Sequence, residues 1–273
     1  MKEFYIRVLS GIIYVTLFLI ALNSQNALIA LFFVFGLICI AEFNKLINQK
    51  GIISFIIFIV LYISFAYWQL ALDSNEGFNE AIQILHVLTI FVQLFLIKDL
   101  FSEKTLPLFI TNRYINTTFY LSSAFIFLIL IANYYETFNP NILLGSFILV
   151  WVNDSFAYLI GKNFGKQKLF LRISPKKTVE GFLGGLFFSC IASYFIARIT
   201  GTLNSTSWLI LSIIISVFGT LGDLIESKYK RQAKVKDSGV IMPGHGGLLD
   251  RLDSIIFAAP FIYLFLRIYN YVS

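Results

Sequence analysis

The sequence predicts an all-α protein that crosses a membrane several times. Of its 273 residues, 58% are hydrophobic and only 13% are charged, whereas a soluble domain carries about 25% charged residues. Its apolar runs are near the length of a helix that crosses the hydrocarbon core, and they lack the alternation of a membrane β-strand. Because backbone groups in lipid must satisfy one another within the chain, these runs are expected to be polytopic transmembrane helices.

About nine spans are expected, each ending at polar or turn-forming residues. The first follows Met1–Glu3 directly and has no convincing cleavage site, so it is interpreted as a retained helix. The second is short, which favours a tilted or partly interfacial helix. The predicted spans are residues 4–22, 27–43, 52–72, 81–98, 115–135, 141–161, 179–199, 207–224 and 254–271.

The basic residues fall almost entirely on one side of this arrangement. Of the 21 Lys and Arg residues, all but Arg198 and Arg267 lie on the side of the N-terminus. The positive-inside rule therefore places the N-terminus in the cytoplasm and the C-terminus outside. We expect a multi-pass protein of the cell's inner (plasma) membrane with its polar face toward the cytoplasm. The net charge of +6 suits the lipid bilayer surface and a phosphate-bearing substrate, and no nucleic-acid partner is predicted.

The polar residues are unevenly spread along the chain. Residues 1–140 are apolar with scattered charge, whereas the charged and glycine-rich segments follow residue 150. We therefore predict one integral membrane domain, with residues 1–140 as a scaffold half and residues 141–273 as a catalytic half. No internal repeat is visible, which weakens the alternative of a secondary transporter, because such folds often have paired halves.

The longest polar segment, Ser227 to Asp253, is the strongest indication of chemistry and is expected to be one charged loop. It combines six basic residues, three carboxylates and a Pro-Gly-His-Gly-Gly turn. Positive charge suits phosphate oxygens, carboxylates suit a divalent ion, and glycine permits close backbone approach. His245 in the turn would donate to a phosphate or organise the loop, since a lone histidine is weak evidence for a catalytic base.

Two aspartates, Asp154 and Asp223, lie within predicted spans. An ionised Asp there costs about 2.5–3.5 kcal/mol on insertion, so such a residue indicates function by default. Together with Asp250 and Asp253 they would suit Mg²⁺, which binds one or two carboxylates beside water and substrate phosphate. The structural alternative is that Asp223 only reaches the interface from a helix end and that Asp154 pairs with a lysine.

Two basic pairs, Lys176–Lys177 and Lys230–Arg231, are candidates for phosphate binding. The alternative is the ordinary enrichment of basic residues in cytoplasmic loops. Ser174 and Thr178 favour the first pair, because hydroxyls and a helix start beside lysines suit an anion. The GxxxG spacing at Gly161–Gly165 and Gly181–Gly185 predicts closely packed helices rather than a binding site.

Three stretches of the long polar segment match one known signature, with a spacing between them that fits it without a gap: Ser227-Lys228-Tyr229-Lys230-Arg231, Lys236-Asp237-Ser238-Gly239, and Pro243-Gly244-His245-Gly246-Gly247-Leu248-Leu249-Asp250-Arg251-Leu252-Asp253. Together they resemble the signature of the integral-membrane phosphatidate cytidylyltransferases, the CDP-diacylglycerol synthases. Tyr229 and Met242 depart from the residues usual there, and both changes are apolar. The similarity also covers Asp154–Tyr158, Gly161-Lys162 and Ser174–Gly181; in the N-terminal half it is limited to Arg7, Gly11 and Glu42-Phe43.

The resemblance implies that CMP is transferred from CTP to phosphatidic acid, giving CDP-diacylglycerol and pyrophosphate. It also implies Mg²⁺, with K⁺ as a second cation, metal ligation by Asp223 and Asp250, and a homodimer. The candidate catalytic residues are Asp223, Asp250, Lys230, Arg231 and Asp154. The candidate substrate-binding residues are Ser174, Lys176, Lys177, Thr178, Lys236, Asp237, His245, Gly246, Gly247, Arg251 and Asp253.

Other functions stay open at this point. A CDP-alcohol phosphotransferase is disfavoured, because Asp250-Arg251-Leu252-Asp253 lacks the four-Asp pattern of that class. A transporter of phosphate-bearing solutes would explain aspartates at membrane depth, but not so one-sided a charge distribution. A cytidylyltransferase that acts on another lipid phosphate, such as an ether-linked one, would carry the same polar segments. A purely structural membrane scaffold is the least favoured, because it would not retain several carboxylates at membrane depth.

Overall fold

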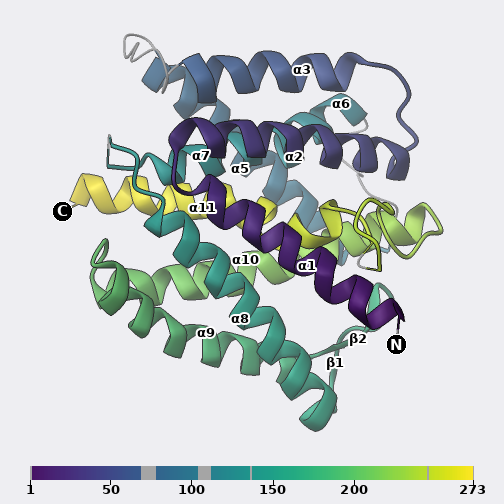
Figure 1. The fold of residues 1–273 in the computed structure, drawn as a ribbon. Helices are drawn as coiled ribbons and strands as arrows, with labels where there is room; N and C mark the ends of the chain where they lie inside the picture. The colour runs from purple at the N-terminus through teal and green to yellow at the C-terminus, as the bar shows by residue number, and fades with distance from the viewer. Residues whose placement is uncertain (1, 69–77, 104–111, 136, 245, 273) are drawn as a thin grey trace. The chain divides into compact units, whose positions relative to one another are not determined.

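The computed structural model describes residues 2–68, 78–103, 112–135, 137–244 and 246–272 (Figure 1). Helices make up nearly all regular structure in these residues, which confirms the predicted all-α class. Each of the nine predicted apolar segments coincides with a helical stretch, although residues 69–72 of the third lie outside the described part of the chain.

The helices begin and end within a few residues of the predicted bounds, with two exceptions described below. They are α1 (Lys2–Ala21), α2 (Gln25–Leu46), α3 (Ile53–Tyr62) continued by the π-helix η1 (Ile63–Trp68), α5 (Phe78–Phe101), α6 (Arg113–Asn116) continued by the π-helix η2 (Thr117–Ser122) and α7 (Ser123–Ala132), α8 (Asn141–Phe164), α9 (Val179–Thr200), α10 (Ser205–Gln232) and α11 (Leu249–Val272). Among the described residues, seven helices are long and apolar enough to cross a membrane, and Val8–Ala21 and Ile53–Tyr67 form shorter apolar helices.

The chain divides into two compact units, the first of which contains residues 1–130 and 228–252. Its core is rich in phenylalanine. Phe125 of α7 meets Phe32 of α2 and Phe58 of α3 edge to face, with ring centroids 6.2 and 6.3 Å apart. All three side chains are fully buried, and edge-to-face pairs of this kind are favourable beyond their burial. Aromatic packing between α2, α3 and α7 therefore forms part of the core of the first unit.

The second unit contains residues 131–227 and 253–273. In it α8 and α9 lie side by side and are joined by a small hairpin (Figure 1). A side chain at Gly181 would lie 2.7 Å from the Ala157 carbonyl oxygen, and one at Gly185 would lie 2.6 Å from that of Asn153. Glycine therefore lets the two backbones touch, which confirms the close packing predicted from the GxxxG spacing.

The hairpin between α8 and α9 is the one sheet in the described residues and was not predicted. Strand β1 (Lys168–Phe170) pairs antiparallel with β2 (Ser174–Thr178), with Lys168 opposite Thr178 and Phe170 opposite Ser174. Its strands are short and rich in lysine, so they carry little of the alternating apolar pattern by which a strand is recognised.

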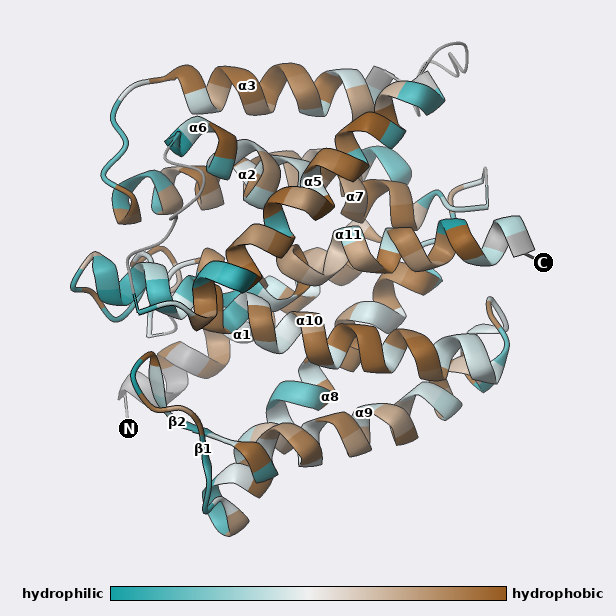
Figure 2. Ribbon diagram, turned by 180° about the vertical axis from the view of Figure 1, so that it is seen from behind, coloured by the Kyte–Doolittle hydropathy of each residue, from teal (hydrophilic) through white to brown (hydrophobic). Residues whose placement is uncertain are grey.

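The prediction of one continuous charged loop from Ser227 to Asp253 is wrong. Helix α10 continues to Gln232, eight residues past the predicted end of its apolar run, and α11 begins at Leu249. The loop is therefore limited to residues 233–248. Tyr229 is fully buried on the extended part of α10, which shows that packing and not hydropathy decides where this helix ends. Hydrophilic residues gather at this end of α10 and on the β1–β2 hairpin (Figure 2).

Candidate functional site

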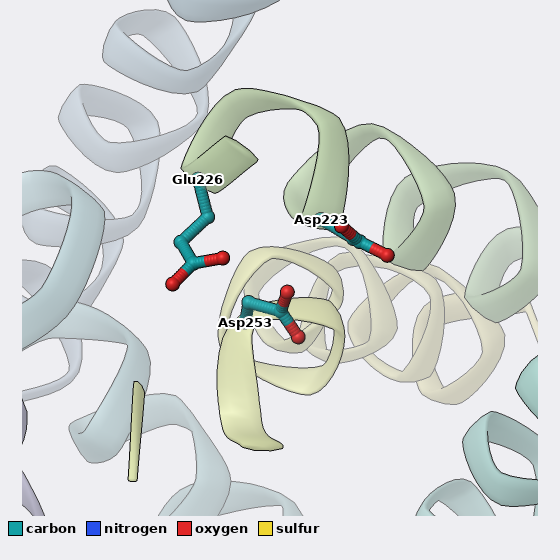
Figure 3. Close-up of side chains that lie close together, drawn as sticks. All are labelled: Asp223, Glu226 and Asp253. Atoms are coloured by element: carbon teal, nitrogen blue, oxygen red, sulfur yellow. The ribbon is translucent and has the colours of Figure 1, made fainter. Parts of the chain in front are cut away.

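Three carboxylates lie together where α10 and α11 pack in the second unit (Figure 3). Asp223 and Glu226 come from α10, and Asp253 comes from the first turns of α11. One oxygen from each residue lies within 4.8 Å of the others. Glu226 and Asp253 are buried, and Asp223 is 30% exposed.

Sequence spacing and one glycine bring these three groups together. Asp223 and Glu226 are three residues apart and therefore share a helix face. A Cβ atom on Gly222 would lie 2.5 Å from the Cβ of Phe257 and 2.7 Å from the Asp253 carbonyl oxygen. Since real side chains do not tolerate such distances, glycine at this position lets the two helices approach closely. That approach places Asp253 beside the α10 carboxylates.

Lys177 provides a positive charge at the edge of this acidic cluster. Its Nζ lies 2.5 Å from Oδ2 of Asp223, and the Ser227 hydroxyl donates to Oδ1 of the same carboxylate at 3.1 Å. Burial by itself would lower the pKa of Lys177, but the negative charge of Asp223 and, to a smaller extent, those of Asp154 and Asp253 raise this pKa above its usual value. Lys177 therefore stays positively charged throughout the physiological range.

The backbone around Lys177 is held by two local contacts. The Thr178 hydroxyl accepts a hydrogen bond from the Gly181 amide at 3.1 Å and so caps the N-terminus of α9. The Glu180 carboxylate accepts bonds from the Lys166 and Gln167 amides at 3.0 and 3.1 Å. These bonds close the hairpin onto the helix start, and they fix the strand that carries Lys177.

The acidic cluster has the donor set of a divalent cation site. Mg²⁺ and Ca²⁺ prefer carboxylate oxygens, and carboxylates crowded in a buried setting need compensating positive charge. Lys177 forms an ion pair with Asp223, one of the three carboxylates. The residues present therefore fit a bound divalent ion.

Asp250 belongs to a different network, in the first unit. Its Oδ1 accepts from Lys230 Nζ at 2.6 Å. Its Oδ2 accepts from the Ser238 amide and hydroxyl, both at 2.9 Å, and from the Gly247 amide at 2.8 Å. The side chains of Lys230 and Asp250 are only 11% and 5% exposed. This is a buried ion pair whose carboxylate is bonded on both oxygens.

The turn that precedes Asp250 depends on glycine. Met242 and Gly246 exchange two backbone hydrogen bonds, at 2.9 and 3.1 Å. Gly244 and Gly246 have φ values of 77° and 93°, a region that favours glycine because it has no Cβ. His245, predicted to bind substrate, lies outside the described residues.

The other predicted site residues divide by exposure. Ser174 is half-buried, whereas Asp154, Lys176, Arg231, Lys236, Asp237 and Arg251 are exposed. Asp154 accepts a long hydrogen bond of 3.4 Å from Asn153, and Arg231 donates to the Val235 carbonyl at 3.3 Å. These side chains are accessible from solvent, whereas those of Lys230 and Asp250 are buried in their ion pair.

Three polar residues that the fold organises were not among the candidate catalytic and substrate-binding residues. Glu226 joins the acidic cluster, and its spacing from Asp223 was the available signal. Ser238 donates to Asp250. Lys228 is buried and donates to the Asp99 and Ser102 carbonyls at the end of α5, at 2.6 and 2.9 Å; its charge is thus used to stabilise a helix C-terminus.

Comparisons with known proteins find the same family that the polar segments of the sequence resemble. Residues 5–269 match the family described as the Cytidylyltransferase family. A phosphatidate cytidylyltransferase of Bacillus subtilis (strain 168) is 33% identical over 97% of this chain and 98% of its own. A protein of the same name from Staphylococcus epidermidis is 34% identical over 96% of this chain and 98% of its own. One from Staphylococcus aureus is 48% identical over 141 residues, about half of each chain.

Proposed function

Since this chain belongs to the cytidylyltransferase family, we propose that it is a CTP:phosphatidate cytidylyltransferase. A phosphate oxygen of phosphatidic acid forms a bond to the α-phosphorus of CTP. The bond between this phosphorus and the oxygen that bridges to the β-phosphate breaks, and that oxygen leaves with pyrophosphate. The products are CDP-diacylglycerol and pyrophosphate. The observation that carries the proposal is the acidic cluster of Asp223, Glu226 and Asp253 with Lys177 at its edge.

The reaction needs positioning and charge neutralisation more than proton transfer. Phosphatidic acid brings its own nucleophilic oxygen, so no serine or cysteine nucleophile is required. Two highly charged phosphate groups must approach each other, and cations held in place by the fold lower the cost of that approach. Lys177 and Lys230 are both held by carboxylates, so their ammonium groups need little reorganisation when substrate arrives.

We propose Mg²⁺ as the divalent ion, with K⁺ as a second cation. When bound, Mg²⁺ neutralises charge on the α-phosphate and on the departing pyrophosphate. Asp223 and Asp250 are the ligands that the motif favours. Glu226 and Asp253 are further candidate ligands for Mg²⁺, because they share the acidic cluster with Asp223. Asp250 has Lys230, Ser238 and Gly247 as its present partners, so ligation by Asp250 would require it to share or exchange one of them.

The remaining basic and small polar residues are proposed to bind substrate. Exposed cations at Lys176, Arg231, Lys236 and Arg251 would meet the outer phosphate oxygens of CTP and the lipid headgroup. Asp154, Ser174, Thr178, Asp237, His245 and the backbone of Gly246 and Gly247 complete the proposed set. Among these, Thr178 already caps α9 and Gly247 already donates to Asp250, so their proposed contribution is to shape the site.

The membrane arrangement is also a proposal beyond the seven long apolar helices. We propose nine crossings, with the N-terminus and the site facing the cytoplasm, where CTP is present. This orientation follows from the one-sided distribution of Lys and Arg. A bacterial inner membrane and a homodimer are proposed with it, and residues 1–140 and 141–273 are proposed as the supporting and working halves.

The proposal is tested by forming CDP-diacylglycerol from CTP and phosphatidic acid with purified protein in detergent. Mg²⁺ is titrated for the wild type and for Asp250→Asn, Asp253→Asn and Glu226→Gln. Glu80→Gln serves as a matched control, because Glu80 is exposed at the start of α5. Mg²⁺-dependent product from the wild type and from the control supports the function.

The Mg²⁺ titration also distinguishes residues that bind the metal from residues that only support the Lys230–Asp250 ion pair. A variant that lacks a metal ligand should need more Mg²⁺ for half-maximal activity. A variant that only disturbs the Lys230 network should lose rate at every Mg²⁺ concentration. Folded wild type that makes no product with any of several lipid phosphates and nucleotides would refute the enzyme assignment and favour transport.

A further inference from the structure

Glu42 is a buried carboxylate that the proposed reaction does not use. It lies near the end of α2, is only 2% exposed, and sits within a helix apolar enough to cross a membrane. A carboxylate in such a setting is costly unless hydrogen bonds compensate its burial. Its partners therefore indicate why it is there.

Those partners are the backbone at the start of α11. Oε1 of Glu42 accepts from the Leu248 amide at 3.1 Å, and Oε2 accepts from the Leu249 amide at 2.8 Å. The first amides of a helix have no partner within the helix and carry its positive partial charge. Glu42 thus caps α11 although it lies 206 and 207 residues before Leu248 and Leu249 in the sequence.

The loop before α11 is packed directly against the same carboxylate. A Cβ atom on Gly239 would lie 2.2 Å from Oε1 of Glu42, and one on Gly247 would lie 2.6 Å from Oε2. The Ser238 hydroxyl lies 3.3 Å from Oε2 of Glu42 and 2.9 Å from Oδ2 of Asp250. Ser238 therefore links the Glu42 carboxylate to the Asp250 carboxylate.

Phe43, the residue after Glu42, packs beside the segment that carries Lys230, the ion-pair partner of Asp250. Phe43 packs edge to face on Tyr229, with ring centroids 5.0 Å apart, and Tyr229 immediately precedes Lys230. The two consecutive residues on α2 thus contact both segments of the Lys230–Asp250 pair: Glu42 contacts the start of α11, and Phe43 contacts the end of α10.

We propose that Glu42 is a positioning residue that holds the Asp250–Lys230 pair in its working geometry through Ser238 and the Leu248 and Leu249 amides. This inference rests on the proposed function, because it assigns Glu42 a role in that reaction. Glu42 does not contact substrate. Its carboxylate orients the Leu248 and Leu249 amides and the Ser238 hydroxyl, and these groups orient Asp250.

The test compares Glu42→Gln, Glu42→Asp and the control Glu80→Gln in detergent. Glutamine keeps the size of Glu42 but offers one acceptor oxygen and places an NH₂ group against a backbone donor. Aspartate keeps the charge and both acceptors on a shorter side chain. If Glu42 only filled space, glutamine would be tolerated better than aspartate; if it acts as a charged cap, aspartate retains more activity than glutamine.

Two readouts are measured on each variant. Hydrogen exchange of the peptide covering residues 237–252 should accelerate about 10- to 100-fold in Glu42→Gln, the factor expected when a hydrogen bond to a charged group is lost. The kcat should fall by a similar factor while KM for CTP changes little. Ser238→Ala, which removes the shared hydroxyl without altering α2, should lower kcat less, and it serves if Glu42→Gln does not fold.

Two results would overturn the inference. One is exchange in residues 237–252 that matches the wild type in Glu42→Gln. The other is accelerated exchange with unchanged kcat, which would make the cap structural only. An inactive wild type would instead count against the proposed function, and the exchange data would still decide whether Glu42 holds the loop.

Discussion

Gly222 offers the sharpest test of how α10 and α11 build the acidic cluster. In Gly222→Ala, the new Cβ would lie 2.5 Å from the Cβ of Phe257. Ordinary contacts of this kind begin at 3.4 Å, so the two helices must separate by about 1 Å or tilt. Overpacking of this size costs about 1–3 kcal/mol, whereas alanine regains at most about 1 kcal/mol in helix propensity. The overpacking cost should outweigh this gain, leaving a net loss of stability of up to about 2 kcal/mol.

The effect on activity should exceed the effect on stability. Separation of α10 from α11 moves Asp253 away from Asp223 and Glu226, and a displacement of about 1 Å in a reacting geometry can lower the rate about 100-fold. We therefore expect kcat/KM for CDP-diacylglycerol formation to fall about 10- to 100-fold, with a raised Mg²⁺ requirement. Thermal unfolding in the same detergent measures the stability change.

Gly219→Ala is the matched control, one turn earlier on the same helix. Its Cβ would lie 3.4 Å from the Cβ of Ser254, which is an ordinary contact. The control should therefore keep wild-type activity and gain up to about 1 kcal/mol of stability from helix propensity. Wild-type activity in Gly222→Ala, or an equal loss in both variants, would refute the argument that close approach at residue 222 assembles the cluster.

Two further predictions concern the lysines. Lys230→Met leaves the buried Asp250 carboxylate without its cation, so the free energy of unfolding should drop by about 3–5 kcal/mol; thermal unfolding should show partial recovery when Asp250→Asn is added, and no recovery would contradict a direct pair. The raised pKa of Lys177 means that its ion pair with Asp223 contributes fully below the ordinary value of 10.5 and is lost as pH rises through the higher folded value. The stability difference between wild type and Lys177→Met should thus stay constant from pH 7 to about 10 and narrow only above that range, and narrowing near neutral pH would contradict the assignment.

The helical spans were predictable because hydropathy along the chain is a local property. Runs such as 27–43 and 179–199 correspond to α2 and α9 within a few residues. The ends of α10 and α11 were not predictable from hydropathy. Residues 225–232 mix charged and apolar types, and their helix is completed by burial of Tyr229 against Phe43, a contact between segments far apart in the sequence.

The candidate site was predictable in part. Asp223, Lys177, Lys230 and Asp250 stood out as charged residues beside apolar spans, and the fold gives each of them a charged partner. Which carboxylate pairs with which lysine could not be inferred, because the partners are supplied by packing. Glu42 illustrates the same limit: a carboxylate in an apolar span signals a role, but its role as a cap of α11 requires knowing that the two segments meet.

The sequence by itself determined that this protein is a bundle of membrane helices with its polar residues concentrated late in the chain. A lipid environment imposes that result residue by residue, since each span must be apolar and must satisfy its own backbone. Only the tertiary structure decided that Asp253 joins Asp223 and Glu226 while Asp250 pairs with Lys230. Those choices depend on close approaches at Gly222 and Gly247, where an added Cβ would lie 2.5 Å from the Cβ of Phe257 and 2.6 Å from Oε2 of Glu42. Contacts of that kind arise only when segments distant in sequence pack together.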